Sequence, residues 1–297
     1  MRVVLTLTTL PSRYSKLELT LSTIPITLVD AIYLGLPKQA KRTGQVYPPL
    51  PDQISKLVTV VPLDVDYGPI CKLLGGLLSE QDPDTLIISI DDDCTYHPDL
   101  IPQLKELATR YPNTVIAASG LLIGKGFPFI GSFSASTKLA SYLSGFNVPV
   151  SGRPVDIICG FAGVAYRRSF FPEPEQLYPE LLKYTEHSEN LFCNDDVLIS
   201  AYLSGRQVER KVFSQITPLI DANELRGVKD GQELSYSRMK FLKRFSRALV
   251  ESEELGFFSD PEDVSWTETI PVRIIIIALV VLIILILIIA AVATPDD

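Results

Sequence analysis

Three consecutive carboxylates, Asp91, Asp92 and Asp93, directly follow the apolar run at 86–90. Carboxylates this close repel one another, so either solvent screens them or a cation lies between them. The Asp-x-Asp spacing of Asp91 and Asp93 suits a divalent cation that also binds a diphosphate, because the metal ion cancels charge on both partners. An isolated match of this length is more often an acidic loop at the end of a strand, so the rest of the chain must decide.

The acidic run admits two other interpretations. A calcium loop of the EF-hand type is excluded, because counting from Asp91 places Tyr96 where the turn needs glycine and Pro102 where a bidentate glutamate belongs. A phosphatase of the haloacid dehalogenase type stays open. Asp91, Asp93 and Thr95 satisfy its Asp-x-Asp-x-Thr motif, with Asp91 as nucleophile and Asp93 as acid and base. In that family the motif usually lies on the first strand of its domain, whereas here an α/β pattern precedes it.

A second acidic pair, Asp195 and Asp196, occurs in the segment NDDVLIS. Apolar residues at helical spacing follow it: Val197, Leu198, Ala201 and Tyr202. Either aspartate alone is most simply a helix cap, but two adjacent ones exceed what capping needs. One of them can therefore be a general base, with a pKa lowered by the helix dipole and raised by its neighbour. Asp196 is favoured, because Asn194 or Asp195 can supply the cap.

The segment DYGPICK contains two further charged groups, Asp66 and Lys72. Pro69 suits the first turn of a helix, whose N-terminus attracts anions, and Lys72 adds positive charge nearby. These residues indicate an anion site. The same residues are compatible with an ordinary capped helix whose Gly75 and Gly76 pack closely on a sheet.

Composition limits the classes of function. The 297 residues are 46% apolar, which supports a real core, and the net charge of −8 argues against a general affinity for nucleic acid. Four scattered cysteines without a CxxC pair and only two histidines make structural zinc improbable. We expect four reduced thiols and a cytosolic compartment: Cys71, Cys94, Cys159 and Cys193.

Apolar β-branched runs alternate with helical patterns, which favours an α/β sheet with mostly parallel strands. Six strands are expected, at 2–9, 31–37, 57–63, 86–90, 114–119 and 162–168, and helices at 13–23, 69–80 and 98–111. Ligands of such sheets bind beyond the carboxyl ends of the strands, where the acidic run falls. Residues 120–154 are expected to form a long loop or an insertion over the site.

The C-terminal part differs from the rest. Twenty uncharged residues at 274–293 are long enough to cross a bilayer, so we expect a single-pass tail anchor with the preceding residues in the cytosol. The expected organisation is a catalytic domain at 1–223, a basic extension and linker at 224–263, and an anchor region at 264–297. The basic stretch at 225–247 can be a phosphate lid, a membrane-surface helix or a solvated face, and a linker is expected at 251–263.

Five segments together resemble a GT-A glycosyltransferase of a family 2-like branch. In chain order they are TLTTLPSRYSKLELTLSTI, DYGPICKLLGGLL, IISIDDDCTYHP, GFAGVAYRRSFF and NDDVLISAYLSG. The ordered set covers most of the chain before the predicted anchor. The resemblance implies a Rossmann-like nucleotide-binding half and an acceptor-side half that supplies a catalytic carboxylate. The glutamine- and arginine-rich acceptor helix usual in the family is not recognisable.

The resemblance also implies roles for particular residues. Asp91 and Asp93 would bind Mn²⁺ or Mg²⁺, with Asp92 able to exchange roles with either, and Asp196 or Asp195 would be the base. The segment CGFAGVAYRR would lie behind the sugar. Nucleotide contacts are implied for Thr8, Pro11, Arg13, Asp66, Lys72, Asp91 and Asp92.

The expected reaction is therefore transfer of a sugar, with inversion, from a UDP- or GDP-sugar to a hydroxyl on a glycan or lipid-linked acceptor. The partners would be this donor, this acceptor and, through 274–293, a membrane. Two alternatives stay open. One is the Asp91-x-Asp93-x-Thr95 phosphatase, and the other is a non-catalytic, tail-anchored protein that only binds nucleotide or a partner.

Overall fold

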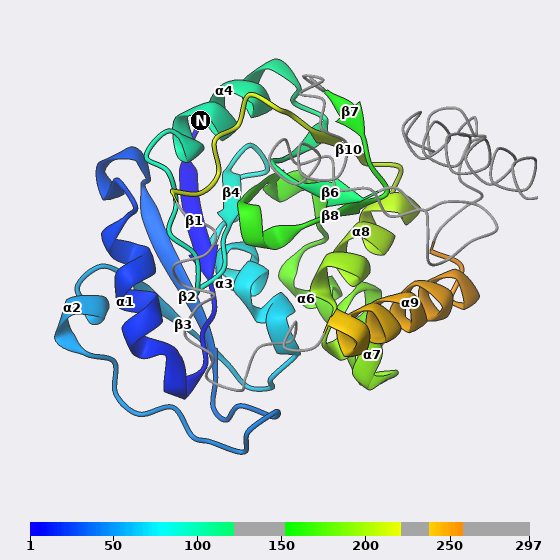
Figure 1. Cartoon of the computed structure of the whole chain (residues 1–297), viewed down its shortest axis with the longest axis horizontal. Helices are drawn as coiled ribbons and strands as arrows, with labels where there is room; N and C mark the ends of the chain where they lie inside the picture. The colour runs from blue at the N-terminus through cyan, green and yellow to red at the C-terminus, as the bar shows by residue number, and fades with distance from the viewer. Residues whose placement is uncertain (122–151, 221–237, 258–297) are drawn as a thin grey trace, which may run out of the picture.

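The centre of the molecule is one mixed sheet (Figure 1). The computed structural model describes residues 1–121, 152–220 and 238–257. In these residues eight strands follow the order β3-β2-β1-β4-β9-β5-β10-β7, and β6 pairs with β8 in a separate two-stranded sheet. The strands are β1 Val3–Leu7, β2 Ala31–Pro37, β3 Thr59–Leu63, β4 Leu86–Ser89, β5 Thr114–Ala117, β6 Gly120–Leu121, β7 Arg153–Pro154, β8 Ile157–Ile158, β9 Val164–Arg167 and β10 Glu209–Val212.

Most strands of the main sheet run in one direction. β1 pairs in parallel with β2 and β4, β2 with β3, and β5 with β10. β9 lies between β4 and β5 and is antiparallel to both, and the short β7 is antiparallel to β10. The prediction of a mostly parallel α/β sheet is confirmed, and the arrangement is consistent with a Rossmann-like fold.

Helices cover both faces of the sheet, because strand side chains alternate between two cores. Val3, Leu5 and Leu7 of β1 pack in one apolar cluster with α1 and α4, whereas Val4 packs in the other with α3 and α8. Burial on both faces explains why β1 is a continuous apolar run. The helices are α1 Tyr14–Ser22, α2 Asp52–Ser55, α3 Cys71–Ser79, α4 Leu100–Arg110, α6 Pro174–Glu180, α7 Glu189–Phe192, α8 Asp195–Gly205 and α9 Arg238–Glu254.

The predicted elements are found, with two differences. All six strands and all three helices occur within a few residues of their expected bounds. The predicted strand at 162–168 runs antiparallel as β9, and β10 was not predicted, because its sequence ERKV lacks an apolar run. Short 3₁₀ turns precede α1 and α3: η1 Pro11–Arg13 and η3 Gly68–Ile70. All four cysteines are free, as expected.

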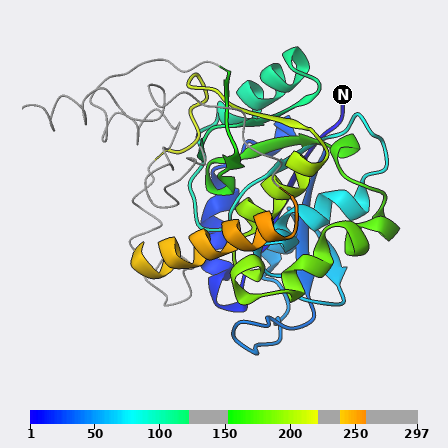
Figure 2. The ribbon, with the colours of Figure 1, turned by 90° about the vertical axis from the view of Figure 1, so that its right-hand side faces the viewer.

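α9 packs against the domain (Figure 2). Phe245, Ala248 and Leu249 join Leu191 of α7 and Val197 of α8 in a third apolar cluster. Part of the predicted basic extension is therefore a docked helix, and its end at Glu254 places the first residues of the predicted linker inside α9.

Several predictions lie outside the described residues. These include the segment 122–151 of the expected insertion and the expected anchor at 274–293. Among the residues that are described, no helix is long and apolar enough to cross a membrane.

Candidate functional site

The candidate site lies where the strand order changes direction. The chain builds β1, β2 and β3 outward on one side of β1, and then places β4 on the other side. The loops after β1 and β4 lead to α1 and α4, which pack in the same apolar cluster. Both loops therefore lie at the carboxyl ends of these neighbouring strands, the edge at which open α/β sheets have the crevice that binds ligands. Arg13 follows β1 and the acidic run 91–93 follows β4, so the fold brings together residues that the sequence separates widely.

A turn at Asp92 and Asp93 divides the acidic run into two environments. Asp92 is buried, and accepts hydrogen bonds from Thr9 Oγ1 at 2.6 Å and from Arg13 Nη1 at 3.3 Å. Asp91 and Asp93 remain partly open, with side chains 30% and 27% exposed. Asp91 and Asp93 are therefore the two members of the run that a ligand can reach.

Burial raises the pKa of Asp92 to about 6, although the Arg13 guanidinium opposes the shift. The neighbouring Asp93 and Asp91 carboxylates add to the shift by repulsion. Arg13 Nη1 also lies 3.5 Å from Asp93 Oδ2, and is itself buried. These contacts indicate that Asp92 fixes Arg13 and the acidic run in place. The predicted exchange of roles between Asp92 and its neighbours finds no support in this geometry.

Three other predicted nucleotide-binding residues shape the loops near the crevice. Thr8 Oγ1 donates to Gly35 O at 2.7 Å, and Pro11 begins the turn η1. Asp66 accepts hydrogen bonds from the backbone N–H groups of Gly68 and Lys41, both at 2.7 Å. None of the three contacts the acidic run through a hydrogen bond in the described structure, so each is placed as a loop-forming residue.

Lys72 joins the two acidic segments. Its Nζ lies 2.8 Å from Asp91 Oδ1 and 2.8 Å from Asp195 Oδ2, and the side chain is 6% exposed. Burial alone would lower the pKa of Lys72, but the Asp195, Asp91 and Asp196 carboxylates raise it well above its ordinary value. Lys72 is therefore a fixed cation at neutral pH. The sequence predicted it near an anion, and the anions that it contacts are the protein's own carboxylates.

Asp196 points to the same place from the start of α8. Its Oδ1 accepts a hydrogen bond from the Gly160 N–H at 2.9 Å, and the residue is half-buried. Burial and the Asp195 carboxylate raise the pKa of Asp196 to about 7, while Lys72 opposes the shift. A carboxylate with a pKa near 7 can exchange a proton at neutral pH, which is what general base catalysis requires.

The first turn of α8 corrects the predicted capping. Asn194 occupies the N-cap position, but its side chain donates to Asn190 O at 2.6 Å and caps no N–H group. Asp195 is engaged by Lys72 rather than by the helix backbone. Neither residue supplies the expected cap, and both aspartates lie inside the first turn, so capping does not explain the pair.

The carboxylates of the candidate site suit a divalent cation only if a bound ligand supplies further donor oxygens. No three His, Cys, Asp or Glu side chains gather into a metal site within the described parts of the chain. Asp91 and Asp93 supply hard oxygen donors, and Mg²⁺ or Mn²⁺ is often held by two carboxylates together with substrate phosphates. Five carboxyl groups interact with the two cations Lys72 and Arg13, and this excess of acidic groups favours such an ion. The five belong to Asp91, Asp92, Asp93, Asp195 and Asp196. The donor set therefore fits a shared metal site.

Sequence reasoning missed the role of Gly160, in the turn η4 Gly160–Ala162 before β9. A Cβ at this position would collide with Lys72 Nζ and lie 2.9 Å from Asp196 Oδ1. The glycine-containing segment was predicted to approach a ligand, whereas its glycine makes room for the site's own side chains. A signal was present, because Gly160 immediately precedes a predicted strand, but the pattern does not show what the glycine faces.

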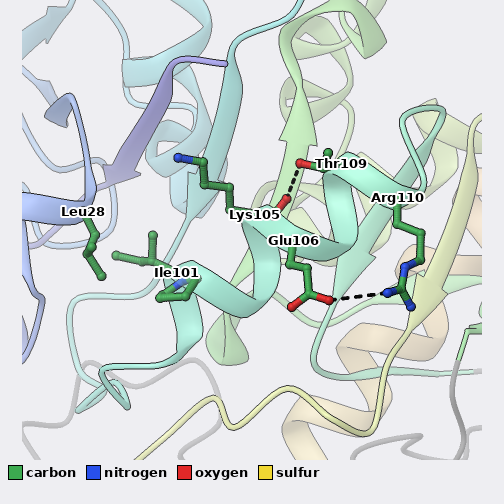
Figure 3. A pocket seen from close by; sticks show the side chains of 7 residues that line it. Leu28, Ile101, Lys105, Glu106, Thr109 and Arg110 are labelled. Atoms are coloured by element: carbon green, nitrogen blue, oxygen red, sulfur yellow. Dashed lines mark hydrogen bonds and ion pairs between the residues drawn. The ribbon is translucent and has the colours of Figure 1, made fainter.

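A surface pocket lies at α4, away from the candidate site (Figure 3). It has a volume of about 670 Å³ and contains none of the predicted site residues. Its lining comes from Leu28 and one side of α4: Ile101, Pro102, Lys105, Glu106, Thr109 and Arg110. Glu106 and Arg110 pair with each other at 3.5 Å, so these charges are turned to one another rather than toward a ligand. This pocket carries no catalytic constellation.

No protein-family model matches this sequence, and no curated protein matches it significantly.

Proposed function

We propose that this protein is a GT-A glycosyltransferase that moves a sugar from a UDP- or GDP-sugar to a hydroxyl group on a glycan or a lipid-linked acceptor. One observation carries the proposal. Two partly exposed carboxylates, Asp91 and Asp93, lie at the switch point of a Rossmann-like sheet, and Lys72 links Asp91 to Asp195 of a second acidic pair at the start of α8. Under this proposal the first pair would bind the donor and the second would supply the proton acceptor.

The proposed division of labour follows the two environments. Asp91 and Asp93 would hold Mg²⁺ or Mn²⁺ beside the donor diphosphate. When bound, the cation neutralises the charge that develops on the departing diphosphate. Arg13, which is paired with Asp92, keeps Asp93 in position, and Lys72 does the same for Asp91. The crevice beyond the carboxyl ends of β1 and β4 receives the nucleotide.

Asp196 is the proposed base. The acceptor oxygen forms a bond to the anomeric carbon of the sugar while the bond from that carbon to the diphosphate oxygen breaks. The acceptor's proton passes to Asp196, and the nucleoside diphosphate leaves with the electron pair of the broken bond. Attack on the face opposite the leaving group inverts the configuration, and no covalent intermediate with the protein is needed.

The predicted anchor at 274–293 is part of the proposal. It would hold the catalytic domain at the cytosolic face of a membrane, which suits a lipid-linked acceptor. Such an acceptor diffuses in the plane of the membrane, so anchoring the enzyme raises the local concentration of both partners.

The test incubates the full chain in detergent with Mn²⁺ and a panel of UDP- and GDP-sugars. Turnover is monitored as release of the nucleoside diphosphate. Release from one donor, increased by a suitable acceptor and strongly reduced in Asp196→Asn, is the expected result. Phosphate release from simple phosphomonoesters without a nucleotide sugar would indicate the phosphatase instead. Saturable nucleotide binding without turnover would indicate a binding protein.

A further inference from the structure

The ammonium group of Lys72 is confined from several directions. Asp91 Oδ1 and Asp195 Oδ2 each lie 2.8 Å away, and the backbone at Gly160 leaves no space for a Cβ beside Nζ. The position of Lys72 on α3 is also fixed, since Thr6 Oγ1 donates to its backbone carbonyl and accepts from the N–H of Gly76 at 3.0 Å. The lysine is therefore an immobile charge, not a side chain that samples the crevice.

The two aspartates of α8 receive different partners as a result. Asp195 is buried and engaged by Lys72, whereas Asp196 is half-buried and held at Oδ1 by the Gly160 N–H. Oδ2 of Asp196 accepts no hydrogen bond from the part of the chain that the structure describes. Asp195 has one fixed cation, and Asp196 keeps one oxygen for a proton from elsewhere.

We propose that Lys72 is a positioning residue that selects Asp196 as the base, by holding Asp195 and Asp91 in a fixed ion-pair bridge and leaving Asp196 to receive the acceptor's proton. This inference rests on the proposed function only for the identity of the group that gives its proton to Asp196. The bridge also sets the separation between the donor side at Asp91 and the base side at α8.

The charges around Asp196 give opposite predictions for two substitutions. Asp195 and Asp91 raise the pKa of Asp196 and Lys72 lowers it. The half-buried Cys159 and the buried Tyr166 also interact with Asp196, and desolvation raises the pKa values of their thiol and hydroxyl groups, so both stay neutral. Loss of the lysine charge must therefore move the titration of Asp196 upward in pH, and loss of the Asp195 charge must move it downward.

The experiment compares the full chain with Lys72→Met, Asp195→Asn and the double variant. The pH dependence of kcat should show an acid limb whose midpoint moves up by roughly 0.5–1 pH unit in Lys72→Met and down in Asp195→Asn. The double variant removes one charge of each sign, so its midpoint should return toward the wild-type value. Lys72→Arg keeps the charge and should restore the midpoint even where kcat remains low.

Donor affinity separates this role from direct contact with the diphosphate. A bridge that positions the base predicts a kcat loss of roughly 10–100-fold in Lys72→Met that exceeds any rise in donor Kd, since the lysine also holds Asp91 on the donor side. A donor Kd that rises by the same factor, with an unmoved acid limb, would overturn the proposal. Shifts of the same sign in Lys72→Met and Asp195→Asn would overturn it too.

A measurement without turnover keeps this test independent of the proposed function. Carbon-13 NMR of the aspartate carboxyl groups, assigned with Asp196→Asn, follows the titration of Asp196 directly. If no donor supports transfer but the opposite shifts appear, the proposed function fails and the bridge stands. If Lys72→Met does not fold, Asp195→Asn decides alone, and an unmoved or upward titration of Asp196 rejects the inference.

Discussion

Adjacent aspartates in this protein lie in different environments because the backbone turns them to different sides. In the run after β4, Asp92 lies inside against Arg13 and Thr9, while Asp91 and Asp93 stay open. At the start of α8, the helix separates Asp195 from Asp196 in the same way. A sequence motif names the carboxylates, but the direction of each side chain decides which one meets a ligand.

Asp93→Asn tests the proposed metal ligand. Removing one of two open carboxylates should weaken Mn²⁺-dependent donor binding by at least roughly tenfold, because a neutral amide is a poorer ligand for a hard cation. The fold should persist, since the substitution also relieves repulsion within the acidic run. Calorimetric titration of donor with Mn²⁺ measures the effect, and Asp99→Asn, at an exposed carboxylate nearby, is the control. Wild-type affinity in Asp93→Asn would reject Asp93 as the ligand.

Asp196→Asn tests the base. The amide cannot accept the proton, so kcat should fall by roughly 10²–10⁴-fold while the donor Kd stays near wild type. Because Asp196 must be ionised and its pKa is raised to about 7, wild-type kcat should rise with pH through that value. Steady-state transfer measured over about pH 5–9 gives kcat of the variant and the pH dependence of wild-type kcat, because this range covers about two pH units on each side of the expected midpoint. Full turnover in Asp196→Asn would mean that the matching of NDDVLIS to a catalytic segment is wrong.

The same carboxyl group should make stability depend on pH. The folded pKa lies above the ordinary value of 3.8, so the folded state holds the proton more tightly than the unfolded chain. Stability from this group is complete at low pH and is lost as pH rises toward about 7. Asp196→Asn copies the neutral form, so its melting temperature should exceed that of wild type by roughly 2–5 °C at pH 8. The melting temperatures of the two proteins should converge near pH 4. Thermal melting in EDTA without ligand measures them, and an equal difference at pH 4 and pH 8 would contradict this prediction.

Secondary-structure elements bring these residues together. The elements themselves were largely predictable from the sequence, but their directions and contacts were not. The buried strands β1, β2 and β4 were predictable because burial on both faces requires an uninterrupted apolar run. The direction of β9 was not predictable, since a buried apolar run has the same pattern in a parallel and in an antiparallel strand. The contact of Lys72 with Asp195 was equally hidden, because it joins α3 to α8 only through the completed sheet.

The docking of α9 gives a prediction at the scale of elements. Leu249 is 8% exposed in the cluster that joins α9 to α7 and α8, while its neighbour Val250 is 44% exposed. Leu249→Ala should cost about 2–3 kcal/mol of unfolding free energy, because it removes buried apolar volume. Val250→Ala should change the unfolding free energy by less than about 0.5 kcal/mol. Urea unfolding measures both, and equal small effects would show that α9 does not contribute to the core.

The whole molecule is a three-layer α/β unit with a proposed anchor outside the described residues. Every residue assigned to the candidate site lies on α3 or α8, or in the turns beside β1, β4, β9 and these helices. Within the described ranges, the buried members of the core clusters that hold these elements together all lie before 250. We therefore expect the site and its supporting core to form without the segment 274–293.

Ending the chain after Asp263 tests this separation. The shortened protein should stay in solution without detergent, keep its melting temperature, and retain hydrolysis of the nucleotide sugar at a rate within about twofold of the full chain. Circular dichroism and nucleotide release measure these properties. Loss of folding on truncation would instead place the apolar segment in the core of the domain.

The place of β9 between β4 and β5, two strands that precede it in the chain, sets the order in which the site can be built as the chain is synthesised. The residues up to β4 complete one half of the crevice early, but the turn before β9 reaches Lys72 only after β9 has entered between β4 and β5. α8, with both aspartates, emerges later still. Pairing across such long stretches is slow relative to local contacts. A ribosome-bound chain would thus expose its acidic run long before Lys72, Gly160 and the two aspartates of α8 could come together.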